Sequence, residues 1–449
     1  MTREFETRPA QVYERLRNRY GQVAPVDVFG ARAWLILGFN EVREVMRDES
    51  HWKKDMENWR ALREGRVASD WPLMASQGFG HMLLRDDERH KTTRQAVDMA
   101  LKPFQDPGEP QAFALNQAVS QHMDELITFF AEGATSGWVD LCAQVARPLP
   151  LMVLNRLFGF PVEQGDDIFM DSWRMVDAGP DAAPAAERLV KATTELAAYK
   201  QSHPGDDLTT RLLAADPPLS VEQVGIELYA ILVIMSELVG HSITNSVLEV
   251  LTGNSGVRTS LTTGHADELV NRVHIASPPW TNCTFRFPVA DTDLGNFRLA
   301  AGDAVMASIA AAHGDPQFLS AMDHEASKSS RAHLAWGTGV HACPGRGLAD
   351  MMVTTAVSRL FERCDFELGL SVDQLPWRSS TYVRGLRSFP VRFRMREAKN
   401  TTARSAPAAG AADDSTALEP VAAAISAEQD RPRSALWRFL ASLRRGGQP

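Results

Sequence analysis

The segment from Val221 to Leu251 constrains the fold of this chain more than any other stretch. It has helical spacing and stays apolar over several consecutive turns, whereas a helix on a protein surface keeps a polar face. We therefore expect a long helix that runs through a core. The chain has 449 residues, 44% of them hydrophobic, which is enough to enclose such a helix in a globular protein.

Helical patterns dominate the rest of the chain, and Pro or Gly residues separate them. They cover residues 11–19, 42–46, the region after Glu88, 115–130, 138–158, 186–202 and 348–361. Strand patterns are shorter, and they lie at residues 33–37, 285–289, 304–309 and 390–395. The sequence thus predicts a mainly α protein with small β-sheets.

The composition changes after Met395. Residues 1–397 hold all of these patterns, whereas residues 398–433 are rich in Ala, Ser and Pro and predict a disordered linker. The final stretch, 434–449, places four large apolar residues on one helical face: Leu436, Trp437, Leu440 and Leu443. It forms either a short amphipathic helix, suited to a partner or an anionic membrane surface, or a frayed tail.

Charge and hydropathy limit the partners and the location of the protein. The net charge is -9, with 47 Lys and Arg against 56 Asp and Glu, which argues against nucleic acid because phosphate binding needs a basic face. A small molecule is the favoured partner. The N-terminus lacks the apolar stretch of a signal peptide, and the longest apolar run, Leu228 to Met235, is too short for a membrane span. We expect a monomeric, cytoplasmic protein without a transmembrane segment.

One cysteine has an unusual setting. The chain has four cysteines without paired spacing, Cys142, Cys283, Cys343 and Cys364. Cys343 lies between Gly339 and Gly345, just before a helical pattern, where free amide groups and the helix dipole favour thiolate over thiol. A stabilised thiolate is both a nucleophile and a metal ligand. His341 lies two residues away and is placed to contact an anionic group of whatever the cysteine holds.

The loop around Cys343 reads Trp336-Gly-Thr-Gly-Val-His341-Ala-Cys343-Pro-Gly345-Arg-Gly-Leu348-Ala349. It resembles the cysteine signature of the cytochrome P450 superfamily, Phe-Gly-x-Gly-x-His-x-Cys-x-Gly-x-x-Leu-Ala, and Trp336 in place of Phe is the only departure. The resemblance runs from about residue 11 to 395. It implies the cytochrome P450 fold for residues 1–397, a triangular prism of helices around a buried haem b. Cys343 would be the axial ligand of the iron, and its electron donation favours O–O cleavage.

Other stretches resemble the parts of the family that bind the haem propionates. His90 and Arg94 are four residues apart on one helical face, as in the family helix that binds a propionate. Arg286 matches the position of a further propionate-binding Arg. With His341, the resemblance implies five cofactor-binding residues: His90, Arg94, Arg286, His341 and Cys343.

The chain departs from the family where a helix normally carries Glu-x-x-Arg. The following Ser277 and Pro278 fix the register, and this register places Asn271 at the Glu position and His274 at the Arg position. We expect the usual ion pair to be absent. Some actinobacterial members that resemble this chain also lack the pair, so haem binding is still expected.

A second departure lies in the long apolar helix. The family usually has Ala-Gly-x-Glu/Asp-Thr there, and this chain has Ser242 in place of the acid and Ile243 in place of the Thr. In the family these two side chains help to deliver protons to iron-bound dioxygen. Three accounts stay open: Ser242 or Thr244 with ordered water acts as the catalytic relay, the substrate supplies the polar group, or the reaction ends without oxygen insertion. The last two are favoured.

The resemblance also implies a substrate pocket. Its expected lining is Trp71, Phe79, Met235, Leu238, Val239, Ile243 and Trp280. Each of these side chains could equally belong to the core, which is the commoner place for an aromatic residue. An aromatic wall suits a small aromatic substrate, and cyclodipeptides with tryptophan are one candidate class, by resemblance.

The sequence favours an oxidoreductase that tailors a secondary metabolite with electrons from a ferredoxin-type partner. Oxidative coupling or cyclisation of an aromatic molecule is the main interpretation, because the proton-delivering pair is lost, and ordinary hydroxylation is the alternative. A haem-binding accessory protein without turnover is a second class. A cofactor-free enzyme with Cys343 as nucleophile is a third, but it needs a base aimed at Cys343 and a group that orients this base.

Overall fold

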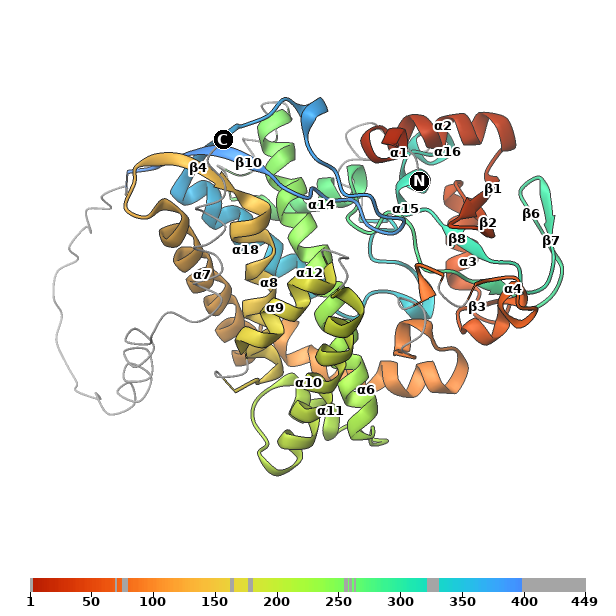
Figure 1. Ribbon diagram of the computed structural model, residues 1–449, viewed down its shortest axis with the longest axis horizontal. Helices are drawn as coiled ribbons and strands as arrows, with labels where there is room; N and C mark the ends of the chain where they lie inside the picture. The colour runs from red at the N-terminus through yellow and green to blue at the C-terminus, as the bar shows by residue number, and fades with distance from the viewer. Residues whose placement is uncertain are drawn as a thin grey trace.

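The computed structural model describes residues 3–68, 71–74, 80–161, 165–176, 181–253, 257, 261, 264–320 and 331–397. The predicted linker at 398–433 and the predicted helix or tail at 434–449 lie outside the described residues. Figure 1 shows a large helical part and, at the other end of the molecule, a smaller part around the sheet of β1 (Val23–Val28), β2 (Ala31–Ile36) and β8 (Val305–Ala307).

The predicted long helix is α12 (Val221–Thr252), and it runs through the helical part (Figure 1). A capping box starts it: the Ser220 hydroxyl accepts from the Gln223 N–H, and the Gln223 side chain accepts from the Ser220 N–H. By length and hydropathy, α12 is the one helix among the described residues that passes as a membrane span, and 61% of its most apolar stretch is buried. This burial fits the core helix that the sequence predicts.

The helices that pack against α12 include α8 (Pro148–Phe158), α10 (Ala182–Ser202), α11 (Leu208–Leu213), α14 (Ala266–Ala276) and α18 (Arg346–Arg363). Further long helices of this part are α6 (Asp87–Gln105), α7 (Pro110–Ala131) and α9 (Gly165–Val176). Their apolar faces meet in the largest hydrophobic cluster, which includes Val239, Ile243 and Leu348. The segment that carries Cys343 enters this cluster directly, through α18.

The smaller part contains short helices and the first sheet. Its helices are α1 (Arg3–Thr7), α2 (Pro9–Tyr20), α3 (Phe39–Arg47), α4 (Arg60–Arg63), α15 (Ile309–His313) and α16 (Pro316–Ser320). In the sheet, β2 pairs with β1 in antiparallel and with β8 in parallel orientation. Two further pairs are antiparallel: β3 (Trp52–Lys53) with β5 (Phe287–Pro288), and β6 (Thr292–Leu294) with β7 (Phe297–Leu299). The β3–β5 pair joins two segments that the site uses.

The predicted helix over residues 138–158 is wrong at its start. Trp138 belongs to β4 (Ser136–Asp140), which pairs with β10 (Pro390–Met395), and β10 pairs in turn with β9 (Cys364–Leu368). After the strand, Cys142–Ala146 forms a π-helical turn and Pro148–Phe158 forms an α-helix, so the rest of the predicted stretch is helical. The Trp138 side chain is 55% exposed, and the guanidinium of Arg392 on β10 lies 4.9 Å from its ring centroid. The strand therefore exists because of a partner far away in the sequence, which a local pattern does not reveal.

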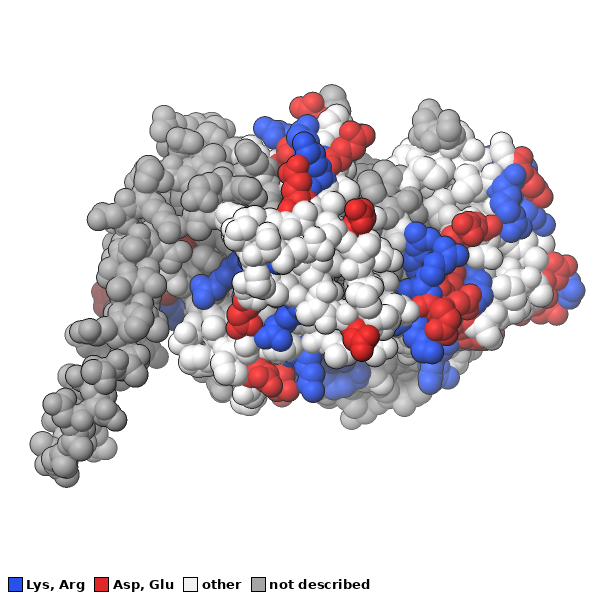
Figure 2. Space-filling model, turned by 90° about the horizontal axis from the view of Figure 1, so that it is seen from below, with Lys and Arg blue, Asp and Glu red and all other residues white. Residues whose placement is uncertain are grey.

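Charged side chains of both signs are mixed on the face that Figure 2 shows, with broad uncharged areas between them. Among the residues that are coloured there, Lys and Arg form no continuous basic surface. The face thus lacks the electrostatic character of a nucleic-acid surface, as the net charge of -9 suggests.

Candidate functional site

Cys343 lies on a tight loop between Trp336 and α18. The loop contains a short helical turn, Gly339–His341, and the Cys343 N–H donates to the Trp336 carbonyl at 2.8 Å. Gly339 has φ +74, and a Cβ on it would lie 2.8 Å from the Met46 carbonyl oxygen on α3. Glycine is therefore required there both for the left-handed backbone and for the close approach of α3.

Cys343 is the most exposed of the four cysteines, since Cys142 and Cys364 are buried and Cys283 is intermediate. The surrounding protein nevertheless raises the pKa of Cys343 to about 11, because desolvation outweighs the Gly345 N–H and Arg94, which lower it. The helix start therefore lowers the pKa of the thiol, as expected, but by less than desolvation raises it. A bound metal cation deprotonates a coordinating thiol outright, so this cysteine suits a metal ligand better than a free nucleophile.

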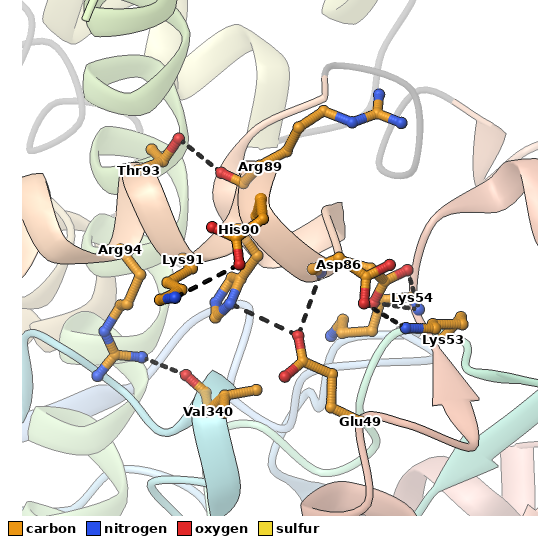
Figure 3. Close-up of polar contacts among 12 residues, drawn as sticks. Glu49, Lys53, Lys54, Asp86, Arg89, His90, Lys91, Thr93, Arg94 and Val340 are labelled. Atoms are coloured by element: carbon orange, nitrogen blue, oxygen red, sulfur yellow. Dashed lines mark hydrogen bonds and ion pairs between the residues drawn. The ribbon is translucent and has the colours of Figure 1, made fainter. Parts of the chain in front are cut away.

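Arg94 fastens the cysteine loop to α6. Its guanidinium donates to the carbonyls of Val340 at 2.8 Å and Ala342 at 2.5 Å, and it pairs with Asp98 one turn along the helix. His90, one turn before Arg94, packs against His341 with ring centroids 4.0 Å apart and an interplanar angle of 39°. Figure 3 shows His90 and Arg94 projecting from α6, with Glu49 and Lys54 on the side of His90 away from Arg94. The structure thus brings the predicted pair from α6 to His341.

Arg286, the last of the predicted cofactor-binding residues, directly precedes β5. It is 3% exposed, and its guanidinium reaches only backbone oxygens, of Trp52 at 3.2 Å and Met46 at 3.4 Å. Neither ring nitrogen of His341 has a hydrogen-bond partner among the described residues. Burial, Lys54 and Arg286 lower the pKa of His341 far below its usual range. Burial, Arg94, Lys54 and Arg286 lower the pKa of His90 to about 4.

These buried basic groups fit an anion. Burying cationic donors without a counter-charge is costly, and the two propionates of a haem would supply it. Ligand atoms of Glu49, His90 and His341 lie within 4.8 Å of one another, a spacing that also suits a cation. Arg94 and Arg286 beside these groups would repel a cation, so the electrostatics favour the carboxylates. The residues present therefore fit a haem with its propionates at this cluster and its iron at Cys343.

The two predicted relay residues on α12, Ser242 and Thr244, differ in what their hydroxyls contact. The Thr244 hydroxyl is buried and donates to the carbonyls of Gly240 at 3.3 Å and His241 at 3.1 Å in its own helix. The Ser242 hydroxyl lies 3.3 Å from the His274 Nε2. Of the two predicted relay residues, only Ser242 has a side-chain partner outside α12 in the part of the chain that the structure describes.

Of the predicted pocket residues on α12, Met235 and Leu238 are partly buried, and Val239 and Ile243 are buried. The sulfur of Met235 lies 3.8 Å from the point that a Cβ on Gly345 would occupy, so this helix face meets the cysteine loop. Residues 235, 238, 239 and 242 share that face by helical spacing. The face thus carries both the apolar wall and Ser242.

The predicted aromatic wall is less uniform. Trp71 packs in a second hydrophobic cluster with Trp59 and Phe285, and its indole N–H donates to the Val28 carbonyl at 3.0 Å. These contacts give it a structural role in the smaller part. Trp280 is partly buried and donates to the Asn282 carbonyl at 2.7 Å. Phe79 lies outside the described residues.

At the Glu-x-x-Arg positions, α14 has two uncharged side chains, Asn271 and His274. The Asn271 carbonyl oxygen accepts from Arg331 at 3.2 Å and lies 3.1 Å from the His333 Nε2. His274 is 2% exposed, and burial, then His333 and Arg346, lower its pKa to about 3. A neutral His274 thus stands where the family has an Arg, as the register predicts.

Sequence reasoning missed two buried groups of the basic cluster, Lys54 and His81. Lys54 is 3% exposed and His81 is 7% exposed, and His81 Nδ1 has no partner among the described residues. Lys54 follows Lys53 in an ordinary polar stretch, and the pairing of β3 with β5 brings it to Thr284, 230 positions later. Nothing in the local pattern distinguishes such a lysine from a surface one.

Comparisons with known proteins agree with this site. Residues 277–381 match the family model described as cytochrome P450. The chain is 31% identical over 401 residues to cytochrome P450 107B1 of Saccharopolyspora erythraea, covering 84% of this chain and 94% of that protein. It is 28% identical over 397 residues to 2-hydroxy-5-methyl-1-naphthoate 7-hydroxylase of Streptomyces carzinostaticus, covering 86% and 95%.

Solved structures give the same result. CYP154C4 from Streptomyces sp. W2061 superposes with a TM-score of 0.75 at 25% identity, covering 84% of this chain and 94% of that one. The ligand-free P450 monooxygenase TamI superposes with a TM-score of 0.72 at 24% identity, covering 87% and 93%. With its helical core, its small sheets and its cysteine loop, the chain therefore belongs to the cytochrome P450 family of haem-thiolate monooxygenases.

Proposed function

We propose that this enzyme hydroxylates a small aromatic molecule of secondary metabolism, with Cys343 as the axial ligand of haem b. The observation that carries the proposal is the pairing of two features on one loop. The accessible Cys343 lies at its end, and His341 lies within a cluster of basic groups with His90, Arg94 and Arg286, of which His90 and Arg286 are buried. A relative named as a naphthoate hydroxylase, at 28% identity, supports an aromatic substrate.

The haem would supply the iron centre that activates dioxygen, and the protein would hold and shield it. Arg94 would fix the loop, because it binds the carbonyls on both sides of His341. Arg286, His90 and His341 would hold the carboxylates of the cofactor. Val239 and Ile243, both apolar and buried, would exclude water from the face of α12 above the cysteine loop.

Proton delivery would fall to Ser242. Its Oγ is within hydrogen-bond distance, 3.3 Å, of Nε2 of the neutral His274. On the other side of the ring, His274 Nδ1 lies 3.8 Å from a carboxylate oxygen of the partly exposed Asp350. A proton held at Ser242 Oγ would thus be replaceable from the His274 side. Thr244 would be unable to take this role without giving up its bonds to the helix backbone.

Oxidative coupling or cyclisation is the second candidate. Ile243 supplies no hydroxyl, and the Thr244 hydroxyl bonds to its own helix, so neither side chain that follows Ser242 on α12 offers a free hydroxyl. An aromatic substrate that loses hydrogen atoms can then couple or close a ring, if the pocket holds the two reacting centres together. A cyclodipeptide is one such substrate. Electrons would come from a ferredoxin-type partner in the cytoplasm in either case.

The test has two stages. The reduced protein with carbon monoxide should give the red-shifted Soret band of a thiolate-bound haem, and Cys343→Ser should abolish this band while Cys364→Ser keeps it. Turnover under labelled dioxygen, followed by mass spectrometry, then separates the reactions. A product with one labelled oxygen atom supports hydroxylation, and a product that has only lost hydrogen supports coupling or cyclisation. A colourless protein would overturn both.

A further inference from the structure

Lys54 is a buried ammonium group that no family motif places at the cofactor. It follows β3 and is 3% exposed, and its Nζ donates to the Thr284 hydroxyl at 3.0 Å. Two backbone N–H groups, of Lys54 and Asp55, donate to the carboxylate of Asp86, which fixes the start of this loop. The side chain is therefore held in a defined place.

No carboxylate among the described residues forms an ion pair with Lys54 or with Arg286. Asp86 uses its oxygens on backbone groups, and Glu49 accepts from the Asp87 N–H at 3.3 Å. Burial, then Arg286, lower the pKa of Lys54 to about 7. The protein thus buries two cationic side chains together. Asp86 acts on both through space, and Glu49 on Arg286, but among the described residues neither cation has a carboxylate in direct contact, an arrangement that a bound anion would stabilise.

The same lysine faces the rest of the basic cluster. Figure 3 shows Lys54 on the same side of His90 as Glu49, and its charge lowers the pKa of His81 and His90. The segment that follows β3 and the segment that precedes β5 carry Lys54 and Arg286 respectively, and these two strands pair. Lys54 and Arg286 therefore approach the site from neighbouring strands, opposite the helix α6 that carries His90 and Arg94.

We propose that Lys54 binds a propionate of the haem, as a counter-charge additional to His90, Arg94, Arg286 and His341. Two fixed cations, Lys54 and Arg286, then balance the two carboxylates of the cofactor. The competing explanation is that Lys54 only supports the loop through its bond to Thr284. The two explanations differ in what should happen when the charge, or the Thr284 hydroxyl, is removed.

The experiment measures the retention of haem by the purified holoenzyme. The ferric protein is mixed with excess apomyoglobin, and the rate of haem transfer is read from the absorption spectrum. Lys54→Met should speed the transfer about ten- to a hundredfold, the effect of losing one hydrogen bond to a charged group. Lys54→Arg should stay close to the wild type because it keeps the charge. Lys91→Met, at an exposed site of α6, is the control for charge loss alone.

Two further readouts separate the propionate from loop support. Thr284→Val removes the partner of Lys54 and keeps the ammonium, so its transfer rate should resemble that of the wild type. The haem reduction potential should move to more negative values in Lys54→Met, because a lost cation favours the ferric state. Exchange with haem dimethyl ester, which lacks the carboxylates, should be equally fast in the wild type and in Lys54→Met.

Three results would overturn the proposal. The first is a wild-type rate of haem transfer in Lys54→Met, and the second is a Thr284→Val variant that loses haem as fast as Lys54→Met. The third is a difference between Lys54→Met and the wild type that persists when haem dimethyl ester is bound. If Lys54→Met does not fold, Lys54→Gln serves in the same comparisons. Loss of turnover alone, with normal haem retention and an unchanged potential, would count against Lys54 and leave the hydroxylation proposal intact.

Discussion

The imidazole of His274 lies edge-on against the indole of Trp336, with ring centroids 4.7 Å apart and an interplanar angle of 80°. Both residues stand where the family pattern has another residue, an Arg on α14 and a Phe at the start of the cysteine loop. His274 also contacts Ser242, the third departure, at 3.3 Å. Three of the departures, Ser242, His274 and Trp336, therefore form one contact network that links α12, α14 and the cysteine loop.

A charge at position 274 should destabilise this network. His274 is 2% exposed, and its low pKa keeps it neutral. His274→Arg should lower the free energy of unfolding by up to about 3–5 kcal/mol, because it buries a charge whose nearest carboxylate, Asp350, already pairs with Arg346. Adding Ser242→Asp should restore part of this loss, since the two side chains are in contact. Urea unfolding of the holoenzyme checks both, and a His274→Arg variant as stable as the wild type would contradict the argument.

Gly339 should not tolerate a side chain. Gly339→Ala combines a left-handed φ with a clash against the Met46 carbonyl, so we expect a loss of stability of about 1–3 kcal/mol or more and a weaker thiolate Soret band. Gly30→Ala is the matched control, since its φ is +88 but no atom lies within 4 Å of the added Cβ. Thermal unfolding and the carbon monoxide spectrum should show the difference, and equal effects of the two substitutions would rule out the contact with α3.

The proton role of Ser242 can be tested against Thr244. Ser242→Ala should lower the yield of product per electron pair about a hundredfold and divert the electrons to hydrogen peroxide, the low end of the contribution of a positioned proton donor. Thr244→Val should leave this yield nearly unchanged, because its hydroxyl bonds only to the helix. The measurement is peroxide against product at equal electron supply. If Thr244→Val uncouples the enzyme and Ser242→Ala does not, the two assignments are reversed.

Glu227 should make stability depend on pH. It is 4% exposed, its carboxyl accepts from the Met82 N–H at 2.7 Å, and burial raises its pKa to about 8. The folded state thus keeps a proton that the unfolded state loses above about pH 4.3, so the stability falls as the pH rises and levels off above about pH 8.

Glu227→Gln keeps the acceptor oxygen and cannot ionise. Its stability relative to the wild type should therefore increase with pH and become constant above about pH 8. Urea midpoints at a series of pH values give the two curves. Glu88→Gln, at a side chain that is 84% exposed, is the control and should run parallel to the wild type. Parallel curves for Glu227→Gln would show that the carboxyl is already ionised in the folded protein.

Local patterns predicted the parts of the site that depend on neighbours in the sequence. The glycines around Cys343, the pair His90 and Arg94 on one helix face, and the apolar length of α12 are all visible in short windows. The main helices follow for the same reason, since their apolar spacing is local.

Other features depend on contacts between distant segments, and the sequence did not reveal them. Lys54 reaches Thr284 through the β3–β5 pair, and Trp138 is in a strand because β10 lies beside it. The Gly345 N–H lowers the pKa of Cys343, as the helix start predicts, but desolvation by the surrounding protein outweighs it. The contact of His274 with Trp336 likewise joins two positions that were noted separately.

The bond between Arg94 and the Val340 carbonyl spans 246 positions of the chain. A nascent chain that has emerged only as far as α12 already contains Lys54, His90 and Arg94, but it lacks Arg286, His341 and the thiol of Cys343. Since domains complete their folding only when their last contacting segment is available, the cofactor must be captured near the end of synthesis. Haem is therefore needed when the chain is nearly complete. A truncated chain that ends before residue 340 would contain Lys54, Arg94 and Arg286 but lack the iron ligand Cys343.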